Sequence, residues 1–114
     1  MFEAGALLLI PFPFSDLSSA KRRPVLALTA PDPNGDFIAC PATSRDRWAN
    51  ARRLLPEHMI EGALPLPSWV RTDHVVTLHI ALVVKVLGRA SGRFRVEVAR
   101  DLCQYLQGQP PGAT

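Results

Sequence analysis

Cysteine is scarce in this chain of 114 residues, which contains only Cys40 and Cys103. Two cysteines this far apart cannot form a disulfide framework, and their spacing is not that of a zinc ribbon. Both occur in apolar patterns, so we expect each to be a buried thiol. The sequence therefore predicts neither disulfide bonds nor a cysteine-bound metal, as is typical of the reducing cytoplasm.

Long apolar runs are also absent. No stretch reaches the roughly 20 apolar residues that are needed to cross a bilayer. The short apolar run Ala6–Ile10 follows the acidic residue Glu3 and precedes two prolines, whereas a signal peptide begins with a positively charged segment. We therefore expect a cytoplasmic protein that has no membrane contact.

The overall composition is that of a globular protein, with 47% hydrophobic and 20% charged residues. A chain of this length can bury one core, so we expect a single domain over residues 1–107. Eleven prolines disfavour a fold built from long helices. Residues 108–114 are rich in glycine and proline, and we expect them to form a flexible tail.

Short apolar patterns predict several strands, which are expected at residues 6–11, 25–29, 36–43, 68–71, 74–78 and 83–88. From residue 92 the period changes. Apolar residues then recur every four positions after a potential N-cap, Ser91, and they are Phe94, Val98, Leu102 and Leu106. The sequence therefore predicts a mainly β fold, a small barrel, with a C-terminal helix that covers one barrel face or a dimer interface.

Residues 45–66 are ambiguous. Residues 45–53 fit either one exposed turn of helix or a loop before a short strand at 52–55. Four breakers then interrupt any regular element, namely Pro56, Gly62, Pro65 and Pro67. Trp48 lies among arginines and could stack on a nucleobase or cap the barrel, and we favour the cap. Trp69 lies in a strand pattern and is expected in the core.

Three consecutive cations, Lys21, Arg22 and Arg23, precede Pro24 and an apolar run. Because a residue before proline is confined to extended geometry, Arg23 is held extended where a polar loop enters a strand. A guanidinium fixed in this way can bind a phosphate or carboxylate through two parallel hydrogen bonds. The alternative is that these cations are solvated and only keep the apolar strand from aggregating.

The dipeptide Asn34-Gly35 is a strong hairpin signal between the strands expected at 25–29 and 36–43. An antiparallel hairpin brings the outer ends of its two strands together. Arg23 and Thr43 are therefore expected to lie side by side, and this step needs only the geometry of a hairpin.

Positive charge is concentrated in three segments, residues 21–23, 45–53 and 85–95, although the formal net charge is only +3. Sorted charge of this kind is typical of a surface that attracts polyanions. The alternative is that the three segments are solvated loop edges that never meet on one face.

Several separated motifs resemble those of the PemK/MazF-like toxins. They are Ile10–Asp16 (IPFPFSD), Lys21–Pro24 (KRRP), Cys40–Ser44 (CPATS), Pro67–Arg71 (PSWVR) and Lys85–Arg89 (KVLGR). They occur in the order found in that family, so the resemblance runs from about residue 5 to residue 106. One position departs from it, because many members have aspartate after the early glycine where this chain has Ala6.

The resemblance implies a ribosome-independent endoribonuclease of a type II toxin-antitoxin pair, built as an SH3-like barrel that dimerises. The substrate would be single-stranded RNA cut at a specific sequence, and the partner would be a cognate antitoxin. The family's catalytic arginine falls on Arg23 and its catalytic threonine on Thr43, with Ser44 beside it. The surrounding residues expected to contact RNA are Lys21, Arg22, Arg45, Ser18, Ser19 and Phe14.

RNA cleavage by its own 2′-hydroxyl requires charge stabilisation, a base and an acid. Arginine stays protonated in proteins, so we assign Arg23 to charge stabilisation and Thr43 to hydrogen-bond donation. The base is not evident, because the three histidines, His58, His74 and His79, fit structural or exposed positions better than catalytic ones. A lone His-x-x-Glu at His58 is weak as a metal pair, so no metal and no cofactor is expected.

Two other functions fit the same sequence. Toxins of related fold poison gyrase by protein contact, so the barrel could be a non-catalytic binding module. It could also be a nucleic-acid binder that keeps the basic face and lacks turnover. Either of these would tolerate the loss of Thr43 far better than a nuclease would.

Overall fold

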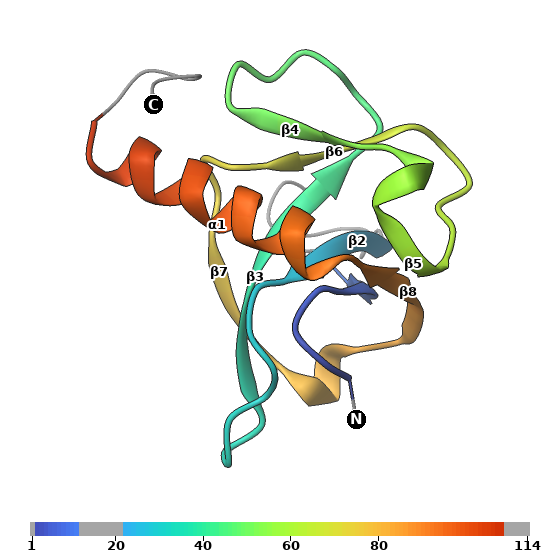
Figure 1. Ribbon diagram of the computed structural model, residues 1–114. Helices are drawn as coiled ribbons and strands as arrows, with labels where there is room; N and C mark the ends of the chain where they lie inside the picture. Colours follow the sequence, from blue (N-terminus) through green and yellow to red (C-terminus); the bar gives the residue numbers. More distant parts are fainter. Residues whose placement is uncertain (1, 12–21, 109–114) are drawn as a thin grey trace.

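Strands and one C-terminal helix make up the computed structural model, which describes residues 2–11 and 22–108 (Figure 1). The strands are β1 (Ala6–Pro11), β2 (Arg22–Ala27), β3 (Asp36–Thr43), β4 (Ala51–Leu54), β5 (Met59–Gly62), β6 (Ser68–Arg71), β7 (Val76–His79) and β8 (Lys85–Ala90). Two 3-10 turns, η1 (Pro56–His58) and η2 (Ile80–Leu82), precede β5 and β8, and the helix α1 spans Gly92–Leu106. The predicted fold class is confirmed.

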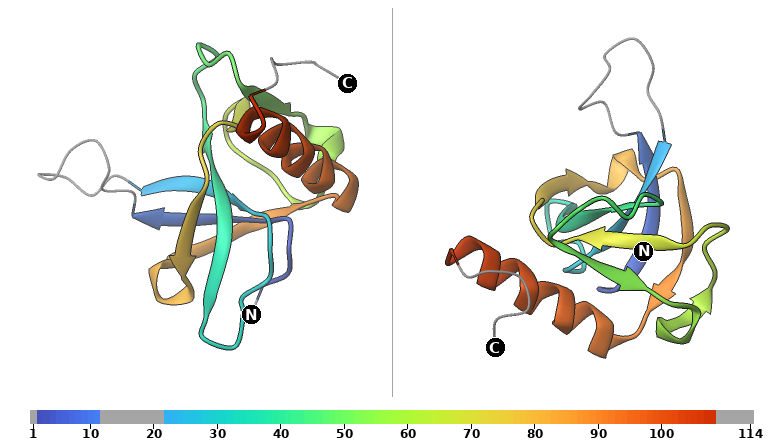
Figure 2. Two further views of the ribbon diagram at one scale, coloured as in Figure 1. Left: turned by 90° about the vertical axis from the view of Figure 1, so that its left-hand side faces the viewer. Right: turned by 90° about the horizontal axis from the view of Figure 1, so that it is seen from above.

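All strand pairs of the described sheet are antiparallel, and its strands follow the order β4-β6-β3-β2-β1-β8-β5, with β7 also paired to β3. The sheet curls into a half-barrel whose two ends are β4 and β5. Strand β3 joins its two sections, because residues 39–41 pair with β2 whereas residues 42–43 pair with β6. Figure 2 shows that α1 lies on the opposite side of the molecule from the end of β1 and the start of β2.

The structure differs from the sequence prediction in the middle of the chain. Residues 45–50 form a loop before a short strand, as one of the two alternatives had it. The sequence pattern does not predict the turn η1 or the strand β5, because Pro56 and Gly62 usually interrupt regular structure. Pro56 instead begins the 3-10 turn, and Gly62, at φ 69°, ends a strand that pairs with β8.

Two clusters of buried side chains lie on the two faces of the sheet. The first contains Phe94, Val98 and Leu102 of α1, packed against residues of β2, β3 and β6. Ser91 is the N-cap of α1, since its hydroxyl accepts the N–H of Phe94. The helix therefore covers a sheet face, but the apolar stripe ends one turn early. Leu106 is 67% exposed.

The second cluster lies on the sheet face away from α1 and includes Val25, Ala27, Phe37 and Ala39. The predicted turn at the start of β3 is present. Gly35 has φ 86°, and a Cβ there would lie 2.7 Å from the His79 ring, so only glycine fits. Of the helices in the described ranges, none is long and apolar enough to cross a membrane.

The two cysteines differ in environment. Cys40 is fully buried, as predicted, whereas Cys103 is exposed because it lies one residue beyond the apolar stripe of α1. Burial, and then the charge of Asp73, raise the pKa of the Cys40 thiol to about 12.

We expect one thiol to react with iodoacetamide at pH 8.5 in the native protein and two in guanidinium chloride, because a buried thiol with a raised pKa supplies almost no thiolate. Mass spectrometry of the alkylated peptides identifies the reacting residue, which should be Cys103. Rapid native labelling of Cys40 would contradict the buried position given to β3.

Candidate active site at the ends of strands β2 and β3

The hairpin of β2 and β3 places Arg23 and Thr43 at the same end of adjacent strands. Their register pairs Val25 with Pro41, Leu26 with Cys40 and Ala27 with Ala39. Carried two residues further, this register sets Arg23 opposite Thr43. Beyond Pro41, however, β3 turns to pair with β6, so the two residues flank the point where the strands separate.

Both side chains project from the same face of the sheet. Side chains alternate along a strand, so Arg23 shares its face with Val25, and Thr43 shares its face with Ala39. Val25 and Ala39 belong to the cluster on the side away from α1. Arg23 and Thr43 therefore lie at the edge of this cluster, where the buried face gives way to solvent.

The Thr43 hydroxyl is oriented by the next turn of the chain. It accepts the backbone N–H of Arg45 at 3.2 Å, which leaves its own O–H as a donor. Ser44 and Arg45 follow at exposed positions. A threonine held in this way can donate to an anionic oxygen in front of the strand end.

Arg23 is half-buried, and among the residues that the structure describes it has no carboxylate partner. Three other arginines are neutralised, each by acidic side chains within 4 Å: Arg52, Arg71 and Arg89. The positive charge of Arg23 is therefore available to an anionic ligand.

A row of side chains that the sequence analysis did not assign continues from Thr43 across the next two strands. Thr43 pairs with Trp69 of β6, and Trp69 pairs with Arg53 of β4. Trp69 is half-buried and belongs to neither buried cluster, so the prediction of a core position for it was wrong. The signal was in the sequence, because Arg71 two residues later must share its face, and an arginine marks the side toward solvent.

Trp48, by contrast, is packed by its neighbours. The Arg71 guanidinium lies 3.8 Å from the centre of its ring and that of Arg47 lies 4.9 Å away. Arg71 is held there by Asp73, at 3.0 Å. These contacts hold the ring against the protein, and the capping role stays a prediction. Trp48 Nε1 is buried and has no hydrogen-bond partner within the described part of the chain.

The family model for the PemK-like, MazF-like toxins of type II toxin-antitoxin systems matches residues 3–106. The chain belongs to this family. Its members include endoribonucleases, and the resemblance seen in the sequence is confirmed.

Solved structures of MazF toxins have the same fold. MazF from Deinococcus radiodurans is 27% identical with a TM-score of 0.71, covering 95% of this chain and 97% of that one. A MazE-MazF complex from the same organism is 25% identical, with a TM-score of 0.66 and coverage of 95% and 96%. An endoribonuclease in complex with its cognate antitoxin, from a mycobacterial species, shares the fold at 15% identity, with a TM-score of 0.64 and coverage of 96% and 95%. A comparison with curated protein sequences gave no match.

In this PemK/MazF-like chain, His58 and His79 have structural partners. His58 Nδ1 accepts the N–H of Leu55, and the ring stacks on Phe94 with centroids 4.7 Å apart. His79 Nδ1 accepts the N–H of Ala81, so its Nε2–H can donate to the carbonyl of Asn34. These contacts agree with the structural positions expected for both.

His74 lies beside Asp73, near the Trp48 packing. Burial and then the Arg71 charge lower the pKa of His74, while Asp73 opposes them. In the described ranges no three histidine, cysteine, aspartate or glutamate side chains are grouped so that they could hold a metal ion.

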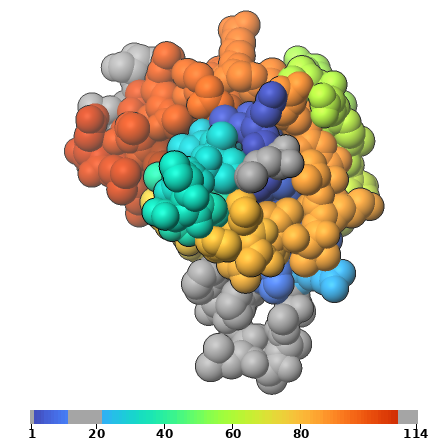
Figure 3. Space-filling view, turned by 90° about the horizontal axis from the view of Figure 1, so that it is seen from below, coloured from blue at the N-terminus to red at the C-terminus, as the bar shows by residue number. Residues whose placement is uncertain are grey.

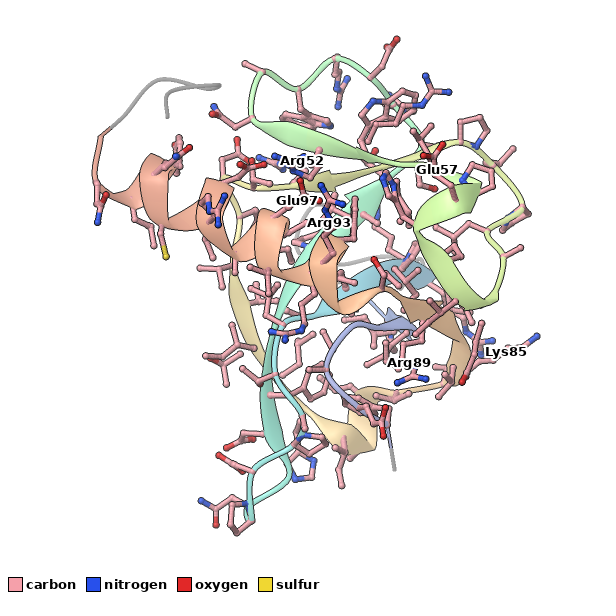
Figure 4. All side chains as sticks on the ribbon, viewed as in Figure 1. Arg52, Glu57, Lys85, Arg89, Arg93 and Glu97 are labelled. Carbon is pink, nitrogen blue, oxygen red and sulfur yellow. The ribbon has the colours of Figure 1, made fainter. Side chains whose placement is uncertain are left out.

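The three basic segments do not form one surface. Arg93 and Arg95 of the last segment lie on α1, on the other side of the molecule from the start of β2 (Figures 2 and 4). In the middle segment, Arg52 faces α1 and pairs with Asp101 at 2.7 Å and with Glu97 at 3.5 Å. Arg45, Arg47 and Arg53 remain exposed, without a described carboxylate partner.

A separate hollow of about 630 Å³ lies on the face seen in Figure 3, between the N-terminal segment and β8. Arg89 in its wall is paired with Glu3 and with Glu61. Its cation is thus neutralised, unlike that of Arg23.

The remaining predicted contact residues, Phe14, Ser18, Ser19 and Lys21, lie outside the described residues.

Proposed function

We propose that this chain is a toxin that cuts single-stranded RNA at the end of the β2–β3 hairpin. The observation that carries the proposal is the strand register, which directs Arg23 and Thr43 to one face at one strand end. A positive charge without a described acidic partner and an oriented hydroxyl form a suitable pair to bind a phosphodiester. Family membership supplies the reaction class.

In the proposed reaction the RNA supplies its own nucleophile. The 2′-oxygen attacks the adjacent phosphorus as its proton passes to a base, and the bond to the 5′-oxygen breaks as that oxygen gains a proton. The products are a 2′,3′-cyclic phosphate and a 5′-hydroxyl. Arg23 stabilises the extra negative charge on the phosphorane, and Thr43 and Ser44 donate hydrogen bonds to its oxygens. This route needs no metal-activated water.

The RNA should be single-stranded, because bases in RNA are generally read when they are unstacked and splayed out. Arg22 and Arg45 flank the proposed site, and we assign them to the phosphates on either side. Lys21, Ser18, Ser19 and Phe14 are proposed as further RNA contacts from the adjoining segment. Phosphate neutralisation by these cations should make binding strongly salt dependent.

The test is incubation of the purified protein with a long single-stranded RNA, with and without EDTA, followed by sequencing of the fragment ends. We expect cuts at a short recurring sequence, with cyclic phosphate ends in both conditions. Intact RNA that is nevertheless bound would favour a nucleic-acid binder without turnover. Intact RNA that is not bound would favour a module that acts by protein contact.

We also propose a cytoplasmic homodimer that is neutralised by an antitoxin. Three apolar residues at the start of β8 and just before it are exposed by 41%, 45% and 54% and could pack against a second copy: Leu82, Val84 and Val86. MazF from Deinococcus radiodurans has been crystallised with MazE. A segment that competes with RNA for the basic site should be acidic and should fold on binding.

We expect a dimer by light scattering at micromolar concentration, and Val86→Asp should shift it toward monomer because it places a charge in an apolar contact. The antitoxin segment should displace labelled RNA. A wild-type monomer would contradict the dimer, and an inhibitor that leaves RNA binding unchanged would contradict a shared site.

A further inference from the structure

We infer that Trp69 is a stacking platform for one nucleobase next to the cleaved phosphate, and that Arg53 binds the backbone of the same nucleotide. The inference rests on the proposed function and extends it to base recognition. Its starting point is the row Thr43–Trp69–Arg53, in which each residue is directly opposite the next in the strand register.

The row is short enough for one nucleotide to reach along it. Directly opposite residues in an antiparallel pair have Cβ atoms about 4.5–5.5 Å apart and project from the same face. The Trp69 side chain therefore projects from β6, the strand next to that of Thr43, and the Arg53 side chain projects from β4, the strand after it. When a phosphate is bound at Thr43, the base of the adjoining nucleotide reaches the Trp69 indole.

The indole and the guanidinium are both available to a ligand. Trp69 is half-buried, and Arg53 is exposed, with its guanidinium lying over the Trp69 ring 5.4 Å from the ring centre. No described carboxylate pairs with Arg53. The Trp48 ring differs, because Arg71 covers it at 3.8 Å and is itself fixed by Asp73. Of the two tryptophans, Trp69 is the one that the strand register places directly opposite Thr43, and the cation over its ring, Arg53, has no described carboxylate to fix it there.

The surface beyond Arg53 is hollowed and mostly apolar. A cavity of about 390 Å³ lies between β4 and residues 62–67, with Arg53 in its wall and Leu55, Leu64 and Leu66 among its lining residues. Leu66 is 60% exposed. An apolar hollow whose wall contains a cation without a described carboxylate partner is suited to a flat aromatic ligand with an anionic backbone.

The competing interpretation is that Arg53 and Trp69 form a surface cation–π pair that only stabilises the end strand β4. The two interpretations differ in one measurable respect. A stacking platform matters only when a base is present to stack on it, whereas a structural pair matters for every RNA equally.

The experiment measures kcat/KM for a short RNA that contains one cut site, and for a set in which each base flanking the cut is removed in turn. We compare the wild type with Trp69→Ala, Trp69→Phe and the control Tyr105→Ala, which removes an exposed aromatic ring from α1. Trp69→Ala should lower kcat/KM for intact RNA about 5–150-fold, the equivalent of one base–aromatic stack. Trp69→Phe should retain most of the activity, and Tyr105→Ala should be unchanged.

The decisive comparison is between variants on the abasic RNAs. At one flanking position, removal of the base should lower the kcat/KM of the wild type by about the factor that Trp69→Ala costs on intact RNA. The same removal should not lower the kcat/KM of Trp69→Ala any further. Two results would overturn the platform while leaving the nuclease intact. In the first, Trp69→Ala lowers kcat/KM by the same factor for intact RNA and for every abasic RNA. In the second, Trp69→Ala does not lower kcat/KM at all. If the wild type cuts no RNA, the proposed function fails instead. The role of Trp69 is then decided by the affinities of the wild type and Trp69→Ala for the same abasic RNAs, measured by fluorescence anisotropy.

Discussion

Arg23→Ala should reduce RNA cleavage to near background, by at least roughly 10²–10³-fold in kcat, which is the cost of removing one donor that stabilises transition-state charge. Arg23 lies at the start of β2, and no described carboxylate neutralises its charge. Its loss leaves the phosphorane without its main counter-charge. Cells that express the variant should grow normally, whereas the wild type should arrest growth.

The conservative change separates geometry from charge. Arg23→Lys keeps the positive charge but should still be severely impaired, because a point charge cannot reproduce the planar, two-pronged contact of a guanidinium with a phosphate. Arg100→Ala is the matched control, since Arg100 is an exposed arginine on α1, on the far side from the site. It should cleave like the wild type.

Stability measurements complete this test. Arg23 lies at the edge of the second cluster and not within it, so Arg23→Ala should change the free energy of unfolding by little more than the roughly 0.5 kcal/mol of a surface substitution. Full activity of the variant would remove Arg23 from the mechanism. A loss of about 2–5 kcal/mol, as for a core truncation, would instead show a structural role.

Local patterns in the sequence were sufficient for most of the fold. The bounds of β1, β3 and β6 agree with the predicted ones, because each coincides with a clear apolar run between turn residues. Strand β2 begins three residues earlier than expected, at Arg22. Its first residues pair with β1 (Pro11 with Arg22), and that contact between distant segments is not visible in local polarity. Strand β5 was missed for a different reason, because Pro56 and Gly62 usually interrupt regular structure.

The candidate site was likewise predicted from the sequence only in part. The hairpin signal at Asn34-Gly35 was enough to bring Arg23 and Thr43 to one strand end. The contribution of Trp69 depends on which strand lies beside β3. That neighbour is β6, 25 residues or more further along the chain, so sequence order alone does not identify it. A large aromatic residue in a strand pattern predicts a core position, whereas the pairing of Trp69 with Thr43 gives its side chain the other face of the sheet.

A single 2′-deoxy substitution at the nucleotide 5′ to the cut should abolish cleavage, with a loss at the limit of detection, while it scarcely weakens binding. The substitution removes only the nucleophile, because it leaves the bases and the charged phosphates in place. Since cations bound to phosphates supply much of the affinity for RNA, affinity should be retained and should fall steeply with salt. EDTA should change neither rate nor binding.

The controls for this prediction are deoxy substitutions elsewhere in the same RNA. A 2′-deoxy group two or more nucleotides from the cut should leave the rate nearly unchanged, because the hydroxyl there is not the nucleophile. Mass spectrometry of the normal products should show a 2′,3′-cyclic phosphate. Cleavage that persists when the reacting hydroxyl is missing would require an outside nucleophile, and cleavage lost with chelator would require a metal ion. In either case Arg23 and Thr43 would serve to position the phosphate for water, and the assigned mechanism would be wrong.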